Sequence, residues 1–215
     1  MTTPGATERS VSLAYDRGTH AYCRAWAYPH PWLKEQRDRF IAMLRSGAQI
    51  LDVGCGPGSD SAFFREKGFE TVGVDVSREM IRCARLHHPE CRFEVLSALH
   101  IEELSVLFDA IWLSYVVLHI ERGDLAHVVK ATFDSLKENG LLFFVTSVDV
   151  ETIEEKAPIA GLKDADGADI LVYTVRWQVD ELRNCFSGYF DELWSTTDVP
   201  LPNKRRSFSS IWRRK

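Results

Sequence analysis

The segment at residues 50–60, ILDVGCGPGSD, constrains the fold more than any other part of the chain. An apolar run reaches Asp52, and then Gly54, Gly56 and Gly58 follow within six positions. Glycine costs conformational entropy, so such a cluster indicates backbone that turns sharply or approaches another group closely. The pattern predicts a buried strand, a tight turn and the start of a helix, a place where α/β proteins commonly bind ligands.

Strand-like and helix-like segments alternate through the middle of the chain. The strand-like runs are short and rich in β-branched or aromatic residues, and the helix-like stretches space their apolar residues by three and four. This alternation predicts a mostly parallel sheet with helices on both faces. The expected strands cover 48–53, 69–75, 91–96, 108–113 and 140–148, and the expected helices cover 59–67, 77–87, 99–105 and 122–138.

The two ends of the chain depart from this alternation. Residues 8–46 have helical character and several aromatic side chains, which predicts a helical cap. Residues 150–169 are acidic and contain glycine and alanine, so we expect a loop or short excursion on the substrate side that extends to 177. A strand near 170–175, a helix near 178–186 and two last strands near 189–197 and 206–214 complete the prediction.

Length and composition fit a single domain over residues 1–215. Hydrophobic residues make up 45% of the chain, enough for a sizeable core. No apolar run approaches the ~18 residues of a membrane span, and the first residues lack the basic and apolar regions of a signal peptide. Five cysteines without a Cys-x-x-Cys pair favour reduced thiols over a disulfide framework or a zinc site. We therefore expect a cytoplasmic protein with no bound metal.

Charge argues against a nucleic-acid partner. The formal net charge is −5. Six basic and no acidic side chains lie within residues 204–215, which leaves 20 basic against 31 acidic residues in the remainder. Nucleic-acid binding requires a basic face, so an acidic body favours a small-molecule partner instead.

The glycine turn is compatible with two chemistries. A dinucleotide fold uses Gly-x-Gly-x-x-Gly, with the pyrophosphate at the helix N-terminus. In GCGPGS the third glycine comes one position early, and Pro57 removes an amide donor that a diphosphate could use. A nicotinamide-dependent oxidoreductase is therefore the less favoured interpretation.

Four segments in order resemble the class I S-adenosylmethionine-dependent methyltransferases. They are the glycine turn, GVDVSREM at 73–80, FDAIWLSYVVLH at 108–119 and LKENGLL at 136–142. YDRGTHAY at 15–22 and YTVRWQVDEL at 173–182 are similar to the small-molecule branch of that family. The resemblance is carried by about residues 48–148. It implies an α/β, doubly wound, Rossmann-like fold with a mostly parallel seven-stranded sheet, an antiparallel last strand and an N-terminal helical cap.

The resemblance also implies S-adenosyl-L-methionine as cofactor and S-adenosyl-L-homocysteine as product. Asp75 matches the acid that holds both ribose hydroxyls, and Asp52 is expected to orient the glycine loop and the methionine ammonium. Ser97 stands where the family often has an acid that accepts from the adenine amino group. The implied cofactor contacts are Tyr15, Tyr22, Asp52, Gly54, Cys55, Gly56, Gly58, Asp75, Val76, Met80, Ser97, Ala98 and Leu113.

On the acceptor side, His119 is the favoured general base, with Tyr115 beside it on the exit of the fourth strand. A structural role for His119 at a helix start remains equally open. His30, Tyr173 and Arg176 are the expected substrate-binding residues. Alternation places Tyr173 and Arg176 on opposite faces of a strand, and either face could meet the acceptor.

The favoured function is methyl transfer to an oxygen, nitrogen or carbon nucleophile of a small-molecule metabolite, by a monomer or homodimer. One alternative is a methyltransferase for RNA or protein. Leu113-Ser-Tyr-Val116 stands in place of the Asn/Asp-Pro-Pro-Tyr signature of one such branch, which weakens that branch only. A non-catalytic S-adenosylmethionine-binding protein is the other alternative, because a fold does not imply turnover.

Overall fold

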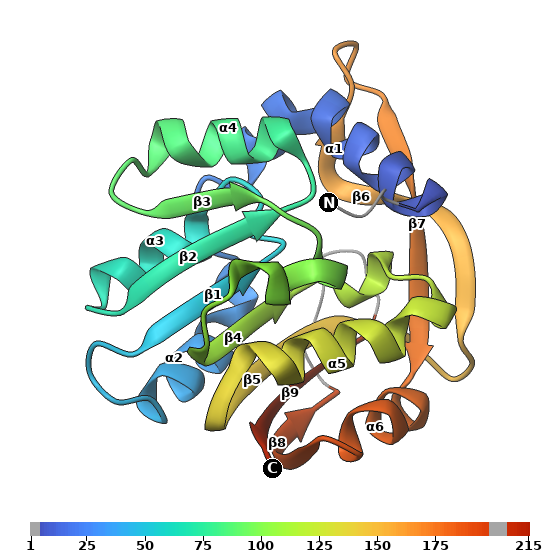
Figure 1. Ribbon diagram of the computed structural model, residues 1–215. Helices are drawn as coiled ribbons and strands as arrows, with labels where there is room; N and C mark the ends of the chain where they lie inside the picture. The colour runs from blue at the N-terminus through green and yellow to red at the C-terminus, as the bar shows by residue number, and fades with distance from the viewer. Residues whose placement is uncertain (1–4, 198–205) are drawn as a thin grey trace.

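The computed structural model describes residues 5–197 and 206–215. Five parallel strands form the centre of its sheet in the order β3-β2-β1-β4-β5 (Figure 1). The glycine turn follows β1, the middle strand of the five, as expected. These strands are β1 (Gln49–Val53), β2 (Glu70–Asp75), β3 (Arg92–Val95), β4 (Phe108–Ser114) and β5 (Leu136–Asp149).

An antiparallel pair completes the sheet beyond β5. β9 (Arg206–Arg214) runs antiparallel to β5, from Leu141 opposite Arg213 to Val148 opposite Arg206. β8 (Phe190–Thr196) pairs with the other edge of β9. The mostly parallel, doubly wound sheet with an antiparallel last strand is therefore confirmed.

The sheet has nine strands in the described residues against the expected seven, and a hairpin lies beyond β5. β6 (Ile153–Lys163) and β7 (Asp169–Gln178) pair antiparallel, and β7 meets β5 only at Val148 and Asp149. The second strand of the hairpin, β7, corresponds to the strand predicted near 170–175, whereas its first strand, β6, was not predicted. Of the two options expected for 150–169, the loop was wrong, and the segment forms an excursion that contains β6. β6 mixes charged residues, a proline and a glycine and is buried at only a few positions, so it lacks the apolar alternation that identifies a strand from sequence.

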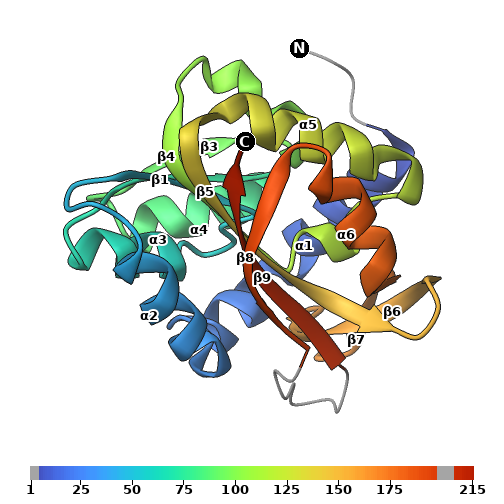
Figure 2. The same ribbon diagram turned by 90° about the horizontal axis from the view of Figure 1, so that it is seen from below.

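Helices cover both faces of the sheet (Figure 2). Ile50, Trp112 and Phe143 point to one face, where they pack against α2 and α3. Their chain neighbours point to the opposite face, toward α5 and α6. No helix in the described ranges is long and apolar enough to cross a membrane. The helices are α2 (Lys34–Ala42), α3 (Ser59–Glu66), α4 (Arg78–His87), η2 (Ala98–Leu104), α5 (Leu125–Ser135) and α6 (Val179–Ser187).

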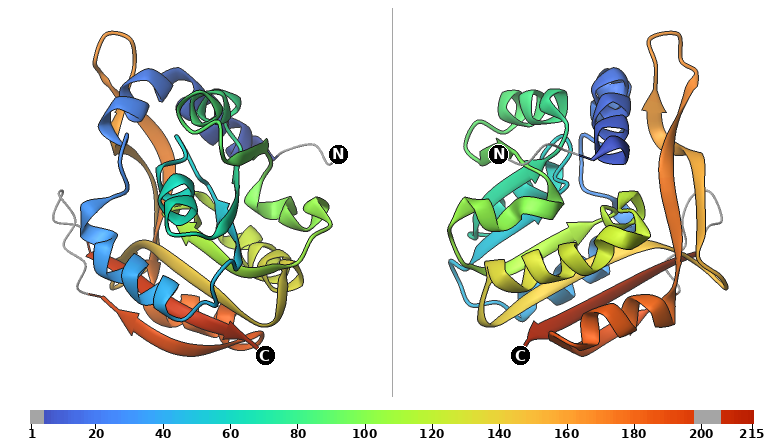
Figure 3. Two further views of the ribbon diagram at one scale, coloured as in Figure 1. Left: turned by 90° about the vertical axis from the view of Figure 1, so that its left-hand side faces the viewer. Right: turned by 45° about the vertical axis from the view of Figure 1, so that its right-hand side comes forward.

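The helical cap is shorter than the expected 8–46. It consists of α1 (Ala6–Ala25) and the short η1 (Pro31–Leu33), whereas α2 packs on the sheet through Phe40. Figure 3 shows α1 standing between α4 and the β6–β7 hairpin. A Cβ added to Gly18 of α1 would lie 2.4 Å from Cδ1 of Leu162, so glycine permits this close approach to β6.

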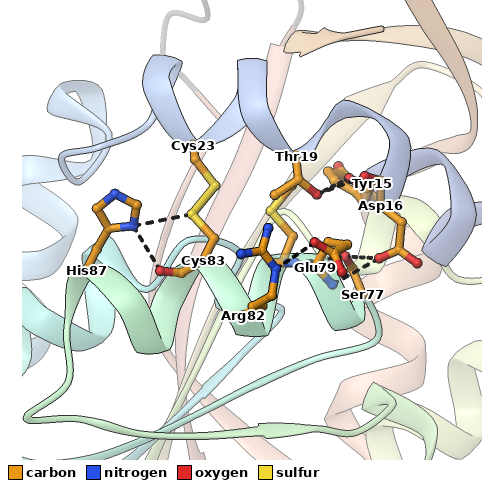
Figure 4. A network of polar contacts seen from close by, with 10 residues as sticks. Tyr15, Asp16, Thr19, Cys23, Ser77, Glu79, Arg82, Cys83 and His87 are labelled. Atoms are coloured by element: carbon orange, nitrogen blue, oxygen red, sulfur yellow. Dashed lines mark hydrogen bonds and ion pairs between the residues drawn. A yellow bond between two sulfur atoms is a disulfide. The ribbon is translucent and has the colours of Figure 1, made fainter. Parts of the chain in front are cut away.

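Two links fasten α1 to α4 (Figure 4). Asp16 accepts hydrogen bonds from the Ser77 hydroxyl at 2.6 Å and from the Glu79 amide at 3.2 Å, which adds a second acceptor to the N-terminus of α4. Further along the two helices, Cys23 of α1 and Cys83 of α4 form a disulfide. The expectation that all cysteines are reduced thiols was wrong for this pair, because sequence spacing does not reveal that α1 and α4 lie side by side.

We expect reduction of the disulfide to lower the free energy of unfolding. The bond joins residues 60 positions apart, and a cross-link of this kind typically contributes about 2–4 kcal/mol by restricting the unfolded chain. Urea denaturation with and without a phosphine reductant measures the effect. Cys185→Ser, which removes a free thiol, should leave the reductant-dependent shift intact, while Cys83→Ser should abolish it. Equal midpoints for the wild type in both conditions would contradict the prediction.

Candidate functional site

A cavity of about 500 Å³ lies at the carboxyl ends of the central strands, beneath α1 and beside β6. The glycine turn forms its floor, and residues from the ends of β2 and β4 form its sides. Parallel α/β sheets place their ligand sites at this edge. The cavity therefore brings the predicted cofactor signature together with the cap and the exit of β4.

The three glycines of the turn all have positive φ, at 67°, 52° and 86°. At Gly54 an added Cβ would lie 2.2 Å from Cγ2 of Val116, so a side chain there would collide with the β4 exit. Gly58 faces Phe93 and Ala84 of the protein interior. At Gly56 the nearest atom to an added Cβ is Cε1 of Tyr22 at 3.7 Å. Gly56 is thus the glycine that keeps space open for a ligand.

Asp75 holds the turn in place. Its carboxylate accepts the Gly56 amide at 3.0 Å through Oδ2 and the Ser77 amide at 2.8 Å through Oδ1. Burial raises the pKa of Asp75 to about 6, against these hydrogen bonds that lower it. Each carboxylate oxygen can accept a further hydrogen bond, so Asp75 keeps acceptor capacity toward the cavity that it lines.

Two further carboxyl groups, those of Asp52 and Asp60, lie behind the glycine turn. Asp60 accepts hydrogen bonds from Arg37 at 3.1 Å and from the Trp112 indole at 3.0 Å. Asp52 accepts the Ser61 hydroxyl at 2.6 Å. Burial raises the pKa of both carboxyls, and Arg37 opposes the rise only at Asp60. Asp60 is therefore the better stabilised as an anion, and Asp52 is the carboxyl that holds a proton more readily.

His119 contacts Tyr15 of the cap rather than open space. Its Nδ1 lies 2.8 Å from the Tyr173 carbonyl, which can only accept, so Nδ1 carries the proton. Its Nε2 then accepts from the Tyr15 hydroxyl at 2.9 Å. Burial lowers the pKa of His119 to about 4 and raises that of Tyr15 well above its ordinary value. Both groups are neutral around pH 7.

Tyr115 adopts a backbone conformation that is rare for a residue with a side chain. Its φ is 57°, at the point where β4 ends. Its hydroxyl accepts the Trp32 indole N–H at 3.1 Å, and burial raises the pKa of this phenol to about 12. Backbone strain of this kind concentrates at functional sites. The strained turn directs the Tyr115 ring into the cavity that Trp32 also lines.

The structure places most of the predicted site residues on this one cavity. Four predicted residues do not line it. Gly58 and Leu113 pack in the interior, Met80 is fully buried, and the Tyr173 hydroxyl donates to Glu154. The predicted residues that do line it are Tyr15, Tyr22, His30, Asp52, Gly54, Cys55, Gly56, Asp75, Val76, Ser97, Ala98, Tyr115, His119 and Arg176.

Other lining residues were missed. Trp26 and Trp32 lie in the aromatic stretch of the cap, and that enrichment was the available signal. Asp60 follows the glycine turn by two positions and reads from sequence as an ordinary first-turn acid of α3. Glu8 lines the cavity with both carboxylate oxygens buried and without a hydrogen-bond partner in the described residues. No sequence pattern points to it.

The comparison with protein families decides the classification. Residues 25–190 match the family model described as a methyltransferase domain. The chain belongs to this methyltransferase family. The methyltransferase resemblance inferred from the glycine turn and its companion segments is thereby confirmed.

Curated relatives match over part of their length. The malonyl-[acyl-carrier protein] O-methyltransferase of Enterobacter lignolyticus is 28% identical over 146 residues, which are 66% of this chain and 55% of that protein. The ubiquinone biosynthesis O-methyltransferase of Xylella fastidiosa is 36% identical over 106 residues, 47% of this chain and 42% of that protein. The chain thus spans about half the length of these relatives.

Solved structures share the fold. The magnesium protoporphyrin IX methyltransferase of Synechocystis, solved with bound S-adenosylmethionine, superimposes with a TM-score of 0.74 at 13% identity and covers 100% of both chains. The 1,6-didemethyltoxoflavin-N1-methyltransferase of Burkholderia thailandensis, solved with S-adenosylhomocysteine, gives 0.71 at 16% identity, over 100% of this chain and 93% of that one. The predicted Rossmann-like fold is confirmed.

We expect Asp52→Asn to stabilise the folded protein at alkaline pH. Because the pKa of Asp52 is higher folded than unfolded, the folded state binds more protons between the two values and stability falls as pH rises through that window. A shift of one pKa unit corresponds to about 1.4 kcal/mol. The free energy of unfolding of the variant should therefore exceed that of the wild type by at least about 1 kcal/mol at pH 8.

Urea denaturation at pH 5 and pH 8 tests this expectation. The advantage of Asp52→Asn should shrink at pH 5, where the wild-type carboxyl keeps its proton. Asp134→Asn, an exposed carboxyl paired with Lys130 on α5, serves as the matched control and should show no such gain at pH 8. If the free energy of unfolding of Asp52→Asn differed from that of the wild type by the same amount at both pH values, the raised pKa of Asp52 would be contradicted.

Proposed function

We propose that this chain transfers the methyl group of S-adenosyl-L-methionine to an oxygen, nitrogen or carbon nucleophile of a small molecule, leaving S-adenosyl-L-homocysteine. The observation that carries the proposal is the shared cavity. The glycine turn and Asp75 form one end of it, and the aromatic side chains of the cap and the β4 exit line the other. A cofactor and an acceptor can therefore meet inside one enclosed site.

The residues present fit this cofactor. Asp75 has acceptor capacity for a diol, and Gly56 leaves space where a side chain would protrude. Asp60 supplies carboxylate charge for the cationic methionine portion, and Asp52 lines the same end of the cavity as a carboxyl that a bound ammonium would favour in its ionised form. The cofactor supplies an already activated methyl group on a sulfonium. The chain then needs only to align the acceptor with it and to exclude water.

The adenine end of the proposed site differs from the family pattern. The Ser97 hydroxyl accepts the Leu99 amide at 3.0 Å, so it caps η2 and has reduced capacity for an adenine amino group. The carboxylate of Glu8, which has no hydrogen-bond partner among the described residues, lines the same cavity. We propose that Glu8 supplies the acid that the third strand lacks.

The geometry supports a positioning role for His119 in place of the expected base. Its only free lone pair is engaged by the Tyr15 hydroxyl, and its low pKa makes it a weak proton acceptor. Through this bond His119 fixes the Tyr15 ring, which also packs edge-to-face on Tyr22 at 5.4 Å. We propose that the pair holds the roof of the cavity over the reacting atoms.

We expect Asp75→Ala to weaken binding of S-adenosylhomocysteine by about 1.5–3 kcal/mol, or roughly 10- to 150-fold, because hydrogen bonds to a charged acceptor are lost. Isothermal titration calorimetry measures the change. Asp134→Ala, which removes an acid on α5 outside the cavity, is the control and should bind like the wild type. Unchanged affinity in a folded Asp75→Ala protein would refute the cofactor site.

A double-mutant cycle tests the link between Tyr15 and His119. Tyr15→Phe and His119→Ala should each lower turnover by about fivefold, the cost of one hydrogen bond, and the double variant should be little worse than either. Because the pKa of His119 is about 4, the wild-type rate should show no titration of this residue between pH 6 and 9. Additive losses in the double variant would contradict the positioning role. So would a titration of the wild-type rate between pH 6 and 9 that disappears in His119→Ala, and either result would support His119 as the general base.

The proposed function itself is tested by a screen of metabolite pools with S-adenosylmethionine, in which a methylated product gains 14 mass units. Gly56→Val is the matched inactive variant, since its side chain would fill the open space at the turn. Methylation of RNA or protein in place of metabolites would select the first alternative. Tight cofactor binding without any product would select the non-catalytic one.

The remaining expectations stay predictions. The chain is proposed to act without nucleic acid or a membrane partner, as a monomer or homodimer. The cytoplasmic location was expected from the cysteine pattern, and the Cys23–Cys83 disulfide weighs against that part of the argument.

A further inference from the structure

The acceptor end of the cavity is a continuous wall of aromatic rings. His30 stacks on Trp32 with ring centres 4.7 Å apart, and Trp26 meets the edges of both at 4.4 and 5.3 Å. Tyr115 packs edge-to-face on His30 at 5.8 Å, and Tyr22 packs on Trp26 at 6.3 Å. All five side chains line the cavity.

Hydrogen bonds at the polar ends of the rings hold this wall rigid. The Trp26 indole donates to the Ala160 carbonyl of β6 at 2.9 Å, and the Trp32 indole donates to the Tyr115 hydroxyl at 3.1 Å. Gly161 allows the close seat of Trp26, since an added Cβ would lie 2.9 Å from its Nε1. The indole N–H groups are therefore used within the wall, and the rings offer apolar surface to a ligand.

Two polar atoms in the same region have no hydrogen-bond partner among the described residues. They are Nδ1 of His30 and the hydroxyl of Ser114, both buried in residues that line the cavity. Burial, aided by the nearby Arg37, lowers the pKa of His30 to about 4, so the imidazole is neutral. Buried polar atoms are almost always hydrogen-bonded, so these two atoms have hydrogen-bonding capacity left for a ligand or an ordered water.

Charged acceptors fit this end poorly. Arg176 is the cation of the cavity lining that could pair with an anion, and it already faces Asp149 at 3.1 Å and Glu155 at 3.4 Å. An alkylammonium would have to lose a proton before it could attack, and a neutral imidazole of such low pKa cannot take it. The rings also pack against one another and do not surround a single point as a cage for a cation would.

We infer that the acceptor is a neutral planar aromatic or heteroaromatic molecule that carries a hydroxyl or ring N–H, packed against the aromatic wall of Trp26, Trp32 and Tyr115 and hydrogen-bonded to His30 or Ser114. This inference rests on the proposed function. Aromatic pairs add about 0.5–1.5 kcal/mol to the burial of their surface, which favours a flat ring over an aliphatic acceptor of equal size.

The reaction balances with these groups. The acceptor's oxygen or nitrogen lone pair forms the new bond to the methyl carbon, and the carbon–sulfur bond breaks with its electron pair remaining on sulfur. The positive charge of the sulfonium passes to the methylated acceptor, whose O–H or N–H proton becomes strongly acidic. His30 Nδ1 accepts the hydrogen bond from that O–H or N–H and orients it, and the proton is released to water.

The test measures methyl transfer from labelled S-adenosylmethionine to a planar set and an aliphatic set of probes. The planar probes are catechol, 5-hydroxyindole and 8-hydroxyquinoline, and the aliphatic ones are cyclohexanol, malonate monomethyl ester and glycine. Saturation-transfer NMR with S-adenosylhomocysteine present measures probe binding separately from turnover. We expect planar probes to bind and to exceed aliphatic ones at least tenfold in kcat/KM.

Variants of the wall sharpen the test. Trp32→Leu should raise the KM of the planar probes at least tenfold and leave the dissociation constant of S-adenosylhomocysteine within twofold, while Trp32→Tyr should recover most of the loss. Trp194→Leu is the matched control, since Trp194 packs under Arg39 away from the cavity and should change neither constant. His30→Ala should lower kcat for the planar probes with little change in cofactor binding.

The outcomes separate the inference from the function on which it rests. With S-adenosylhomocysteine bound, a preference for aliphatic probes, no binding of any planar probe, or an unchanged KM in Trp32→Leu would each overturn the aromatic acceptor and leave the methyltransferase standing. Failure to bind S-adenosylhomocysteine, together with no methylation of any probe, would sink the proposed function itself.

Discussion

The carboxylate of Asp75 is the point on which the rest of the site depends. One of its oxygens holds the amide of Gly56 and the other holds the amide of Ser77, so a single side chain joins the glycine turn to the start of α4. The Val74 carbonyl adds bonds from the amides of Gly54 and Cys55. The turn after β1 is thus fastened to the end of β2. Its positive-φ backbone can then remain open toward the cavity.

Local sequence patterns predicted the residues at the cofactor end of the site but not the contacts at the acceptor end. The glycine turn, Asp75 and the alternation of strands and helices are encoded within short segments, so periodicity and spacing could identify them. The Tyr15–His119 bond joins residues 104 positions apart, and the Cys23–Cys83 bond joins residues 60 apart. Contacts at such separations arise only when the cap closes on the sheet. Sequence could assign Tyr15 and His119 to the site but could not pair them, and it gave no sign that Cys23 and Cys83 meet.

The β6–β7 hairpin shows a different limit of sequence reasoning. Its first strand, β6, is stabilised by pairing with β7, and Leu162 of β6 and Ile170 of β7 pack with Val11 and Ala14 of α1. A strand whose exposed face mixes a charge of each sign with proline and alanine has no apolar repeat to reveal it. Its placement also explains why Arg176 is neutralised: β6 brings Glu155 beside the guanidinium, and the end of β5 brings Asp149.

The fastening of α1 has a kinetic consequence. The helix is bonded to α4 through Asp16 and Cys23, and on its other side it packs on the hairpin through the close contact at Gly18. A lid held along both edges cannot rotate away as a rigid body without breaking several contacts at once. Exchange of ligands would then proceed through local openings of its first turns, around Gly5 and Glu8, where the cavity lining reaches the end of the helix. The residence time of a bound ligand would be governed by how often those turns unwind, because α1 cannot open by a rapid hinge motion.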